Sequence, residues 1–337
     1  MIERIIVLGG KGGVGKSSIS AATAVMLSDL LPDKKILLLS FDMAHNLSDL
    51  FKFEIGDELT KLTNNLWGIE PDPNIYAEEY TQLFTEKMRN LLKKMPIVGL
   101  IPQIKTFVDN TFTADSIPLA LKNAMFFQQI LDAEDVQFDI IIADFPPTGN
   151  MLALFDIPED QIKVVLKYSL NFYNSIKDSL KTFSSMFRKV LHPFEFDDPN
   201  RPKVSDEIVK MLDGLEKRGE RISSLIHDVG SLRLVTIAEK PSFEEIKRAR
   251  DLTKKYVNLE GVHINMITPK SKKCDFCHDM RSTQMKYLDD IKNEFKQTKI
   301  WESNRLKDEP IGLDGLRRLA GEIYGDTGAK EILYPKP

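Results

Sequence analysis

The segment GGKGGVGKSS (residues 9–18) combines glycines, two lysines and serines at a spacing that can bind phosphate. It follows an apolar run, precedes a run of helix formers and fits the pattern G-x-x-x-x-G-K-S/T. Such a loop turns backbone N–H groups toward phosphate oxygens, while its lysine neutralises phosphate charge and its hydroxyl reaches Mg²⁺. The spacing predicts a nucleotide-binding loop made of Gly10, Lys11, Gly12, Gly13, Val14, Gly15, Lys16, Ser17 and Ser18.

Lys16 fills the lysine position of this pattern, so Lys11 has no phosphate left to bind within its own loop. Two interpretations are open. Lys11 reaches into the site of a facing subunit and stabilises the charge that develops between the β- and γ-phosphates, as an arginine finger does. Alternatively, it is a solvated surface lysine.

Two aspartates end apolar runs that predict strands. Asp42 lies in SFDMAHNLSDLF (40–51) and Asp144 in DIIIADFPPTGN (139–150). Ligands of a doubly wound sheet bind at the carboxyl ends of its strands. Asp42 is therefore placed to orient the attacking water, with capping of a turn as the alternative, and Asp144 to hold Mg²⁺ through water.

The only two cysteines of the chain, Cys274 and Cys277, form a C-x-x-C pair. Two thiolates are half of a structural zinc site, and a twofold dimer supplies the other half from its partner. A redox-active pair is the alternative.

These segments together resemble one branch of the nucleotide-dependent ATPases. KGGVGKS resembles the deviant P-loop of the signature-lysine ATPases, and the segments around Asp42, Pro147 and Cys274 resemble those of the arsenite-pump and tail-anchored-protein-targeting ATPases (the ArsA/GET family). The resemblance implies a homodimer that hydrolyses ATP with Mg²⁺, with Asp42, Lys11 and Lys16 as catalytic residues and zinc shared across the dimer. Met43, Asn150 and Asp275 depart from the family pattern, so no role is assigned to Asn150.

The resemblance also implies roles for residues outside the loop. Those expected to respond to nucleotide state, as switch residues, are His45, Asn46, Pro147, Thr148 and Gly149. For His45 the alternative is a structural residue held by hydrogen bonds. Glu239 and Asn265 are expected at the nucleotide or across the dimer interface, with Asn265 bonded to adenine, and a turn or cap residue is the alternative for each.

Alternation of apolar runs with helical patterns predicts an α/β fold, a doubly wound, mainly parallel sheet of the P-loop NTPase type. Strands are expected at 4–10, 35–42, 66–70, 139–145, 232–239, 261–267 and 298–303. The nucleotide-binding core then comprises 1–72, 134–150 and 229–337. Residues 73–133 and 151–228 lack strand patterns and predict an inserted, all-helical client-binding subdomain.

Bulk composition favours a soluble, cytoplasmic protein. The net charge of -4 argues against nucleic-acid binding, and no apolar run approaches the length of a transmembrane segment. The resemblance implies a factor that shields and delivers tail-anchored membrane proteins after translation, with a membrane receptor as a possible further partner. An ATPase subunit of an arsenite efflux system and a nucleotide-regulated chaperone with little hydrolysis are the alternatives.

Overall fold

The computed structural model describes residues 2–41, 46–71, 136–148, 224–270 and 274–337, with residues 82, 86, 90, 130, 133, 217 and 220–222 between them. Within these ranges the chain builds one eight-stranded sheet of order β3-β4-β2-β5-β1-β6-β7-β8. Its strands are β1 (Arg4–Gly10), β2 (Ile36–Ser40), β3 (Thr60–Lys61), β4 (Leu66–Ile69), β5 (Ile140–Asp144), β6 (Gly230–Ile237), β7 (Leu259–Ile267) and β8 (Lys299–Asn304).

The sheet confirms the predicted fold class. All seven predicted strands are present, and neighbours pair in parallel except at one edge. There the two-residue β3 pairs antiparallel with β4, joining Thr60 to Gly68 and Lys61 to Trp67. Strand β3 was not predicted, because a strand of two residues is too short to show an alternating pattern.

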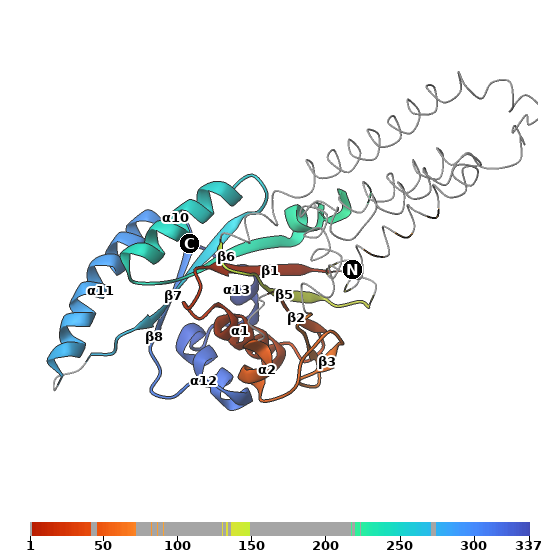
Figure 1. The fold of residues 1–337 in the computed structure, drawn as a ribbon, viewed down its shortest axis with the longest axis horizontal. Helices are drawn as coiled ribbons and strands as arrows, with labels where there is room; N and C mark the ends of the chain where they lie inside the picture. The colour runs from red at the N-terminus through yellow and green to blue at the C-terminus, as the bar shows by residue number, and fades with distance from the viewer. Residues whose placement is uncertain are drawn as a thin grey trace, which may run out of the picture. The chain divides into compact units, whose positions relative to one another are not determined.

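Helices cover both faces of the sheet (Figure 1). Right-handed crossovers explain their distribution. From β1 the chain crosses toward β2 on one side of the sheet, whereas β6, β7 and β8 follow one another toward the other side. Helix α1 therefore lies on the opposite face from α10 and α11. The helices of the described ranges are α1 (Lys16–Leu30), α2 (Asn46–Phe51), α10 (Lys240–Thr253), α11 (Asp275–Glu294), α12 (Gly312–Tyr324) and α13 (Ala329–Leu333).

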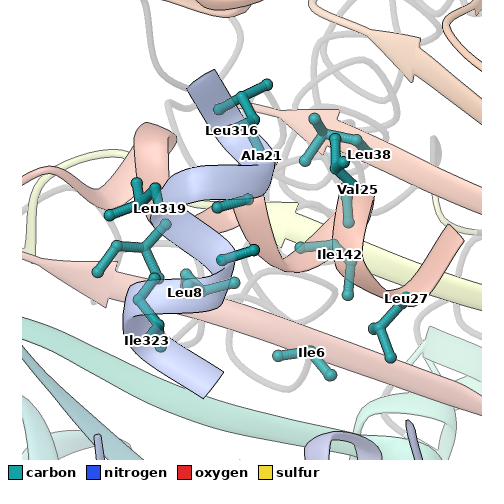
Figure 2. Packing of buried hydrophobic residues seen from close by; sticks show 14 of the residues in the cluster. Ile6, Leu8, Ala21, Val25, Leu27, Leu38, Ile142, Leu316, Leu319 and Ile323 are labelled. Atoms are coloured by element: carbon teal, nitrogen blue, oxygen red, sulfur yellow. The ribbon is translucent and has the colours of Figure 1, made fainter. Parts of the chain in front are cut away.

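The main hydrophobic core lies between the sheet, α1 and α12 (Figure 2). Side chains of α12 at i, i+3 and i+7 form its buried face, and α1 is buried along most of its length. This packing holds α1 against the central strands, so the loop that precedes the helix is fixed at the sheet. The labelled members are Ile6, Leu8, Leu38 and Ile142 of the strands, Ala21, Val25 and Leu27 of α1, and Leu316, Leu319 and Ile323 of α12.

The chain divides into two compact units. One comprises Met1–Tyr76, Phe126–Phe155 and Ile222–Pro337, and the other comprises Ala77–Met125 and Asp156–Arg221. The predicted helical subdomain falls almost wholly outside the described residues, so its client-binding role remains a prediction. Among the residues that are described, no helix is long and apolar enough to cross a membrane.

A buried histidine in the β7–β8 half of the sheet should make stability depend on pH. The His263 ring is 1% exposed, stacks on Trp301 with centroids 4.6 Å apart, and has no hydrogen-bond partner on either nitrogen among the described residues. Burial, with a smaller contribution from the positive charge of Arg233, lowers the pKa of His263 well below its ordinary value of 6.5.

As pH falls below about 6.5, the unfolded chain therefore binds a proton at this residue that the folded chain does not. The stability contribution is complete above that pH and is lost below it. The wild-type protein should lose unfolding free energy when the pH is lowered from 7.5 to 5.5. In His263→Phe we expect this loss, measured by urea titration, to be smaller by about 1 kcal/mol. His227→Phe, at an exposed ring, should leave the pH dependence intact. An unchanged slope in His263→Phe would contradict the prediction.

Candidate functional site

The nucleotide loop lies at the carboxyl ends of the central strands. It follows β1, which pairs with β5 through Leu8 and Asp144 and with β6 through Gly10 and Val235. The chain leaves β1 toward one edge of the sheet and β6 toward the other, so the loop sits at the topological switch point, where open α/β sheets bind ligands. The predicted position of the loop is thus what the topology requires.

Two glycines of the loop are demanded by its surroundings. Gly10 has a φ of 152°, and a Cβ built on it would lie 2.2 Å from the backbone oxygen of Val235. Gly15 has a φ of 89°, and a Cβ there would lie 2.4 Å from Nδ2 of Asn265. The loop therefore fits closely against β6 and β7, which only residues without a side chain permit.

Gly10→Ala should consequently destabilise the protein more than an alanine elsewhere in the loop. The new methyl meets a sheet oxygen that cannot rotate away, and we expect the free energy of unfolding to fall by about 3 kcal/mol or more. Gly13→Ala is the matched control, because φ is 82° there but a Cβ would meet nothing within 4 Å. It should cost about 1–2 kcal/mol. Equal losses in urea unfolding would show that backbone conformation, rather than the contact with Val235, decides the effect.

Side chains that can bind phosphate and a divalent cation lie together at the start of α1. Lys16 and Ser17 are 4% and 8% exposed, and Asp144 is fully buried. Ser20 lies with its Oγ 3.1 Å from Oδ1 of Asp144 and 2.9 Å from the carbonyl oxygen of Lys16. Ser20 thus ties the aspartate to α1. Ser20 was not predicted as a site residue, although a hydroxyl one turn beyond Ser17 was the available signal.

Lys11 occupies the rim of the loop. Its side chain is half-buried, Gly12 and Gly13 beside it are exposed, and Lys11 forms no ion pair with the described residues. Pro147 approaches the same rim, since its Cγ lies 3.9 Å from the position of a Cβ on Gly12. The next residue, Thr148, is 2% exposed, and its hydroxyl has no hydrogen-bond partner within the described ranges. The segment after β5 therefore meets the loop near Lys11.

Asn265 of β7 forms a hydrogen bond with the backbone of the loop. Its Nδ2 donates a hydrogen bond of 2.9 Å to the carbonyl oxygen of Val14, and its Oδ1 accepts one of 2.8 Å from Oγ of Ser303 on β8. Asn265 is 4% exposed and Ser303 is 2% exposed. The expected contact between Asn265 and adenine stays a prediction, but the structure gives this residue a role in holding the loop. Nothing in the local sequence marked Ser303 as its partner.

Several predicted site residues lie outside the described residues, and Glu239 lies just after the carboxyl end of β6. Asp42, His45 and Gly149 are outside the described ranges, and Asn46 begins α2 with a side chain that is not described. Glu239 is exposed and precedes α10 as its N-cap residue, without a side-chain capping bond. The roles assigned to these residues remain predictions.

The two cysteines lie at the start of α11. Cys274 is its N-cap residue, and the backbone N–H of Cys277 donates to Sγ of Cys274 at 3.3 Å. The hydrogen bond from the Cys277 thiol lowers the pKa of Cys274 and raises that of Cys277. Within the described part of the chain, no group of three or more histidine, cysteine or acidic side chains could hold a metal ion. One chain thus offers two thiol ligands, which fits half of a zinc site.

Comparison with known proteins agrees with this geometry. The sequence model of the anion-transporting ATPases matches residues 3–325. A putative arsenical pump-driving ATPase of Prosthecochloris vibrioformis is 29% identical over 99% of this chain and 78% of its own length. The ATPase get3 of Aspergillus niger is 28% identical over 94% and 89%, and an ATPase ASNA1 homolog of Dictyostelium discoideum is 29% identical over 93% and 87%. The chain therefore belongs to the anion-transporting ATPase family and is an enzyme that hydrolyses ATP with Mg²⁺.

Proposed function

We propose that this ATPase is a homodimeric, cytoplasmic targeting factor that shields tail-anchored membrane proteins and delivers them after translation. The relatives include both arsenical pump-driving and get3-type ATPases at similar identity, so overall similarity does not choose between them. The observation that favours targeting is the number and position of the cysteines. The chain has two cysteines, and both belong to the pair at the start of α11.

An arsenite site built on thiols needs cysteines close to one another and apart from any structural zinc. In this chain a zinc ion shared between two subunits would use both cysteines and leave none for a metalloid. The arsenite-pump alternative therefore requires a site without thiols, for which the sequence offers no candidate.

The residues around the loop have separate tasks in hydrolysis. Lys16 and the N–H groups at the start of α1 would hold the β- and γ-phosphates, while Ser17 and Asp144 would hold Mg²⁺ directly and through water. The bound ion neutralises charge on the transferred phosphoryl group. Asp42 would orient the attacking water, and Lys11 would enter the site of the facing subunit.

The same family resemblance assigns the client to the helical insertions, 73–133 and 151–228. Two subunits would present them together as an apolar surface for one transmembrane helix, and a membrane receptor would then accept the complex. Nucleotide state must decide whether this apolar surface is hidden or exposed. To change the ratio of the two states from 1:99 to 99:1, the nucleotide must bind one state about 5.5 kcal/mol more tightly than the other. The segment that carries Pro147 and Thr148 is the proposed source of this bias, because it meets the loop at Gly12.

Co-expression with a client tests the proposed function. The full-length protein is produced together with a single-helix, tail-anchored membrane protein, and with a control in which the helix is deleted. We expect the intact client to co-purify in solution and to be released to liposomes in a nucleotide-dependent way, whereas the control does not bind. Absence of capture with ATP, ADP and no nucleotide would reject targeting. Stimulation of ATP hydrolysis by arsenite without client capture would favour the pump.

A further inference from the structure

Helix α11 meets the sheet with a polar residue where its buried face begins. That face consists of Gln284, Leu288 and Ile291, at i, i+4 and i+7. No described residue of α11 before Gln284 is buried, and Gln284 itself is only 7% exposed. A buried polar side chain at an apolar position is informative, because it must find hydrogen-bond partners there.

The partners of Gln284 are backbone groups at the carboxyl end of β7. Its Oε1 accepts a hydrogen bond of 2.8 Å from the backbone N–H of Thr268, and its Nε2 donates one of 3.4 Å to the carbonyl oxygen of Met266. Arg281, one turn earlier on α11, donates to the carbonyl oxygen of Thr268. Helix α11 thus contacts the chain where β7 ends. The nucleotide loop also lies at the carboxyl ends of the strands (Figure 1).

The segment held in this way has an unusual backbone. Met266 has a φ of 56°, a left-handed conformation that residues with a side chain seldom adopt. The pairing of β7 with β8 shifts register between Ile264 and Ile267, so the irregularity falls on Asn265 and Met266. Irregularities of this kind re-aim a side chain, and they persist only where the surroundings hold them.

Asn265, the first residue of the irregular segment, contacts the nucleotide loop. It donates to the carbonyl oxygen of Val14. Met266 lies against the loop too, since its Cε is 3.3 Å from the position of a Cβ on Gly15. The contacts therefore run without a gap from α11, through the backbone of Met266 and Thr268, to the loop.

We propose that Gln284 is a positioning residue for nucleotide binding. Gln284 forms hydrogen bonds with the backbone of Met266 and Thr268. These bonds hold Asn265 where it can donate to the carbonyl oxygen of Val14, and so keep the loop in its binding conformation. It follows that nucleotide binding and the order of α11 are linked. Because such linkage is reciprocal, bound nucleotide should order the helix as much as the ordered helix favours the nucleotide.

Gln284→Met tests the proposal, because methionine keeps the length and helix propensity of glutamine but makes neither hydrogen bond. In the full-length protein we expect the Kd for Mg-ADP, measured by calorimetry, to rise about tenfold. The kcat for ATP hydrolysis should change less than about threefold, because no group that contacts the reacting atoms is removed. Gln284→Glu keeps the acceptor for Thr268 and should restore most of the affinity.

Lys286→Met is the matched control, since it places the same side chain two residues further along α11 at an exposed position. It should bind Mg-ADP like the wild type. Wild-type affinity in Gln284→Met, or an equal loss in both variants, would overturn the proposal. Hydrogen exchange of the unmodified protein tests it independently of any variant. Mg-ADP should slow exchange at residues 266–268 and at the start of α11, and unchanged exchange at α11 would also overturn it.

Discussion

Replacing Lys11 with alanine should lower the kcat for ATP hydrolysis by about 10³-fold or more while leaving the Kd for ATP nearly unchanged. A cation that stabilises charge only in the transition state contributes to kcat and not to substrate binding. Lys16→Ala should behave differently and weaken ATP binding as well, since Lys16 is buried at the start of α1, where the phosphates are expected. Steady-state hydrolysis and calorimetric ATP binding separate the two variants.

The position of Lys11 supports this expectation. The side chain is half-buried on the rim of the loop and makes no ion pair with the described residues. A lysine that neutralised phosphate in its own site would instead be buried with Lys16. If Lys11→Ala weakens ATP binding as much as Lys16→Ala, Lys11 acts in its own site and the prediction is wrong.

A mixing experiment distinguishes action across the dimer from action within one subunit. Lys11→Ala and Asp42→Asn are each expected to be inactive. In a mixed dimer, the Lys11→Ala subunit keeps its own Asp42 and receives Lys11 from its partner, so one of the two sites is complete. Random mixing should then restore about a quarter of wild-type activity. If Lys11 acts within its own subunit, no mixed site is complete and no activity returns.

The sequence predicted those parts of the site that a local pattern specifies. The loop from Gly10 to Ser17 has fixed spacing, and its neighbouring strand and helix each show a strong apolar pattern. Asp144 was found because it ends an apolar run. These features depend on residues that are close together in the chain. Their meeting at one site follows because the carboxyl ends of parallel strands lie on the same side of the sheet.

The residues that hold the loop in place were not predicted, because their contacts join distant parts of the chain. Ser303 reaches Asn265 across 38 positions, and Asn265 reaches Val14 across 251. Gln284 was not singled out either, since no local signal shows which polar residue of a helix faces a sheet. A serine or glutamine acquires such a role only when the fold sets a backbone group opposite it.

Changing both Cys274 and Cys277 to serine should abolish zinc binding and convert the dimer to monomers. Binding of a structural zinc ion contributes on the order of 10 kcal/mol, more than most interfaces can lose and remain assembled. The N–H group of Cys277 already donates to Sγ of Cys274, an arrangement that stabilises a thiolate ligand. Metal analysis should find about one zinc ion per two wild-type chains and none in the variant, and light scattering should report half the mass.

Phe276→Ser provides the control on the same helical turn. Phe276 is 74% exposed and lies between the two cysteines, so this variant removes apolar surface but no sulfur. It should keep its zinc. A redox-active pair would give another result: no zinc in the wild type, and two thiols that disappear together on mild oxidation. Zinc at one ion per chain would also contradict a shared site.

The cysteine variant also tests the role of Lys11, because the two predictions depend on the same dimer. A monomer retains its own Lys16, Ser17 and Asp144 but lacks the Lys11 of a partner. It should therefore bind ATP with nearly wild-type affinity and hydrolyse it as slowly as Lys11→Ala does. Raising the protein concentration until dimers reform without zinc should restore hydrolysis, because mass action then replaces the metal. Full activity in a monomer would instead show that each subunit contains a complete site.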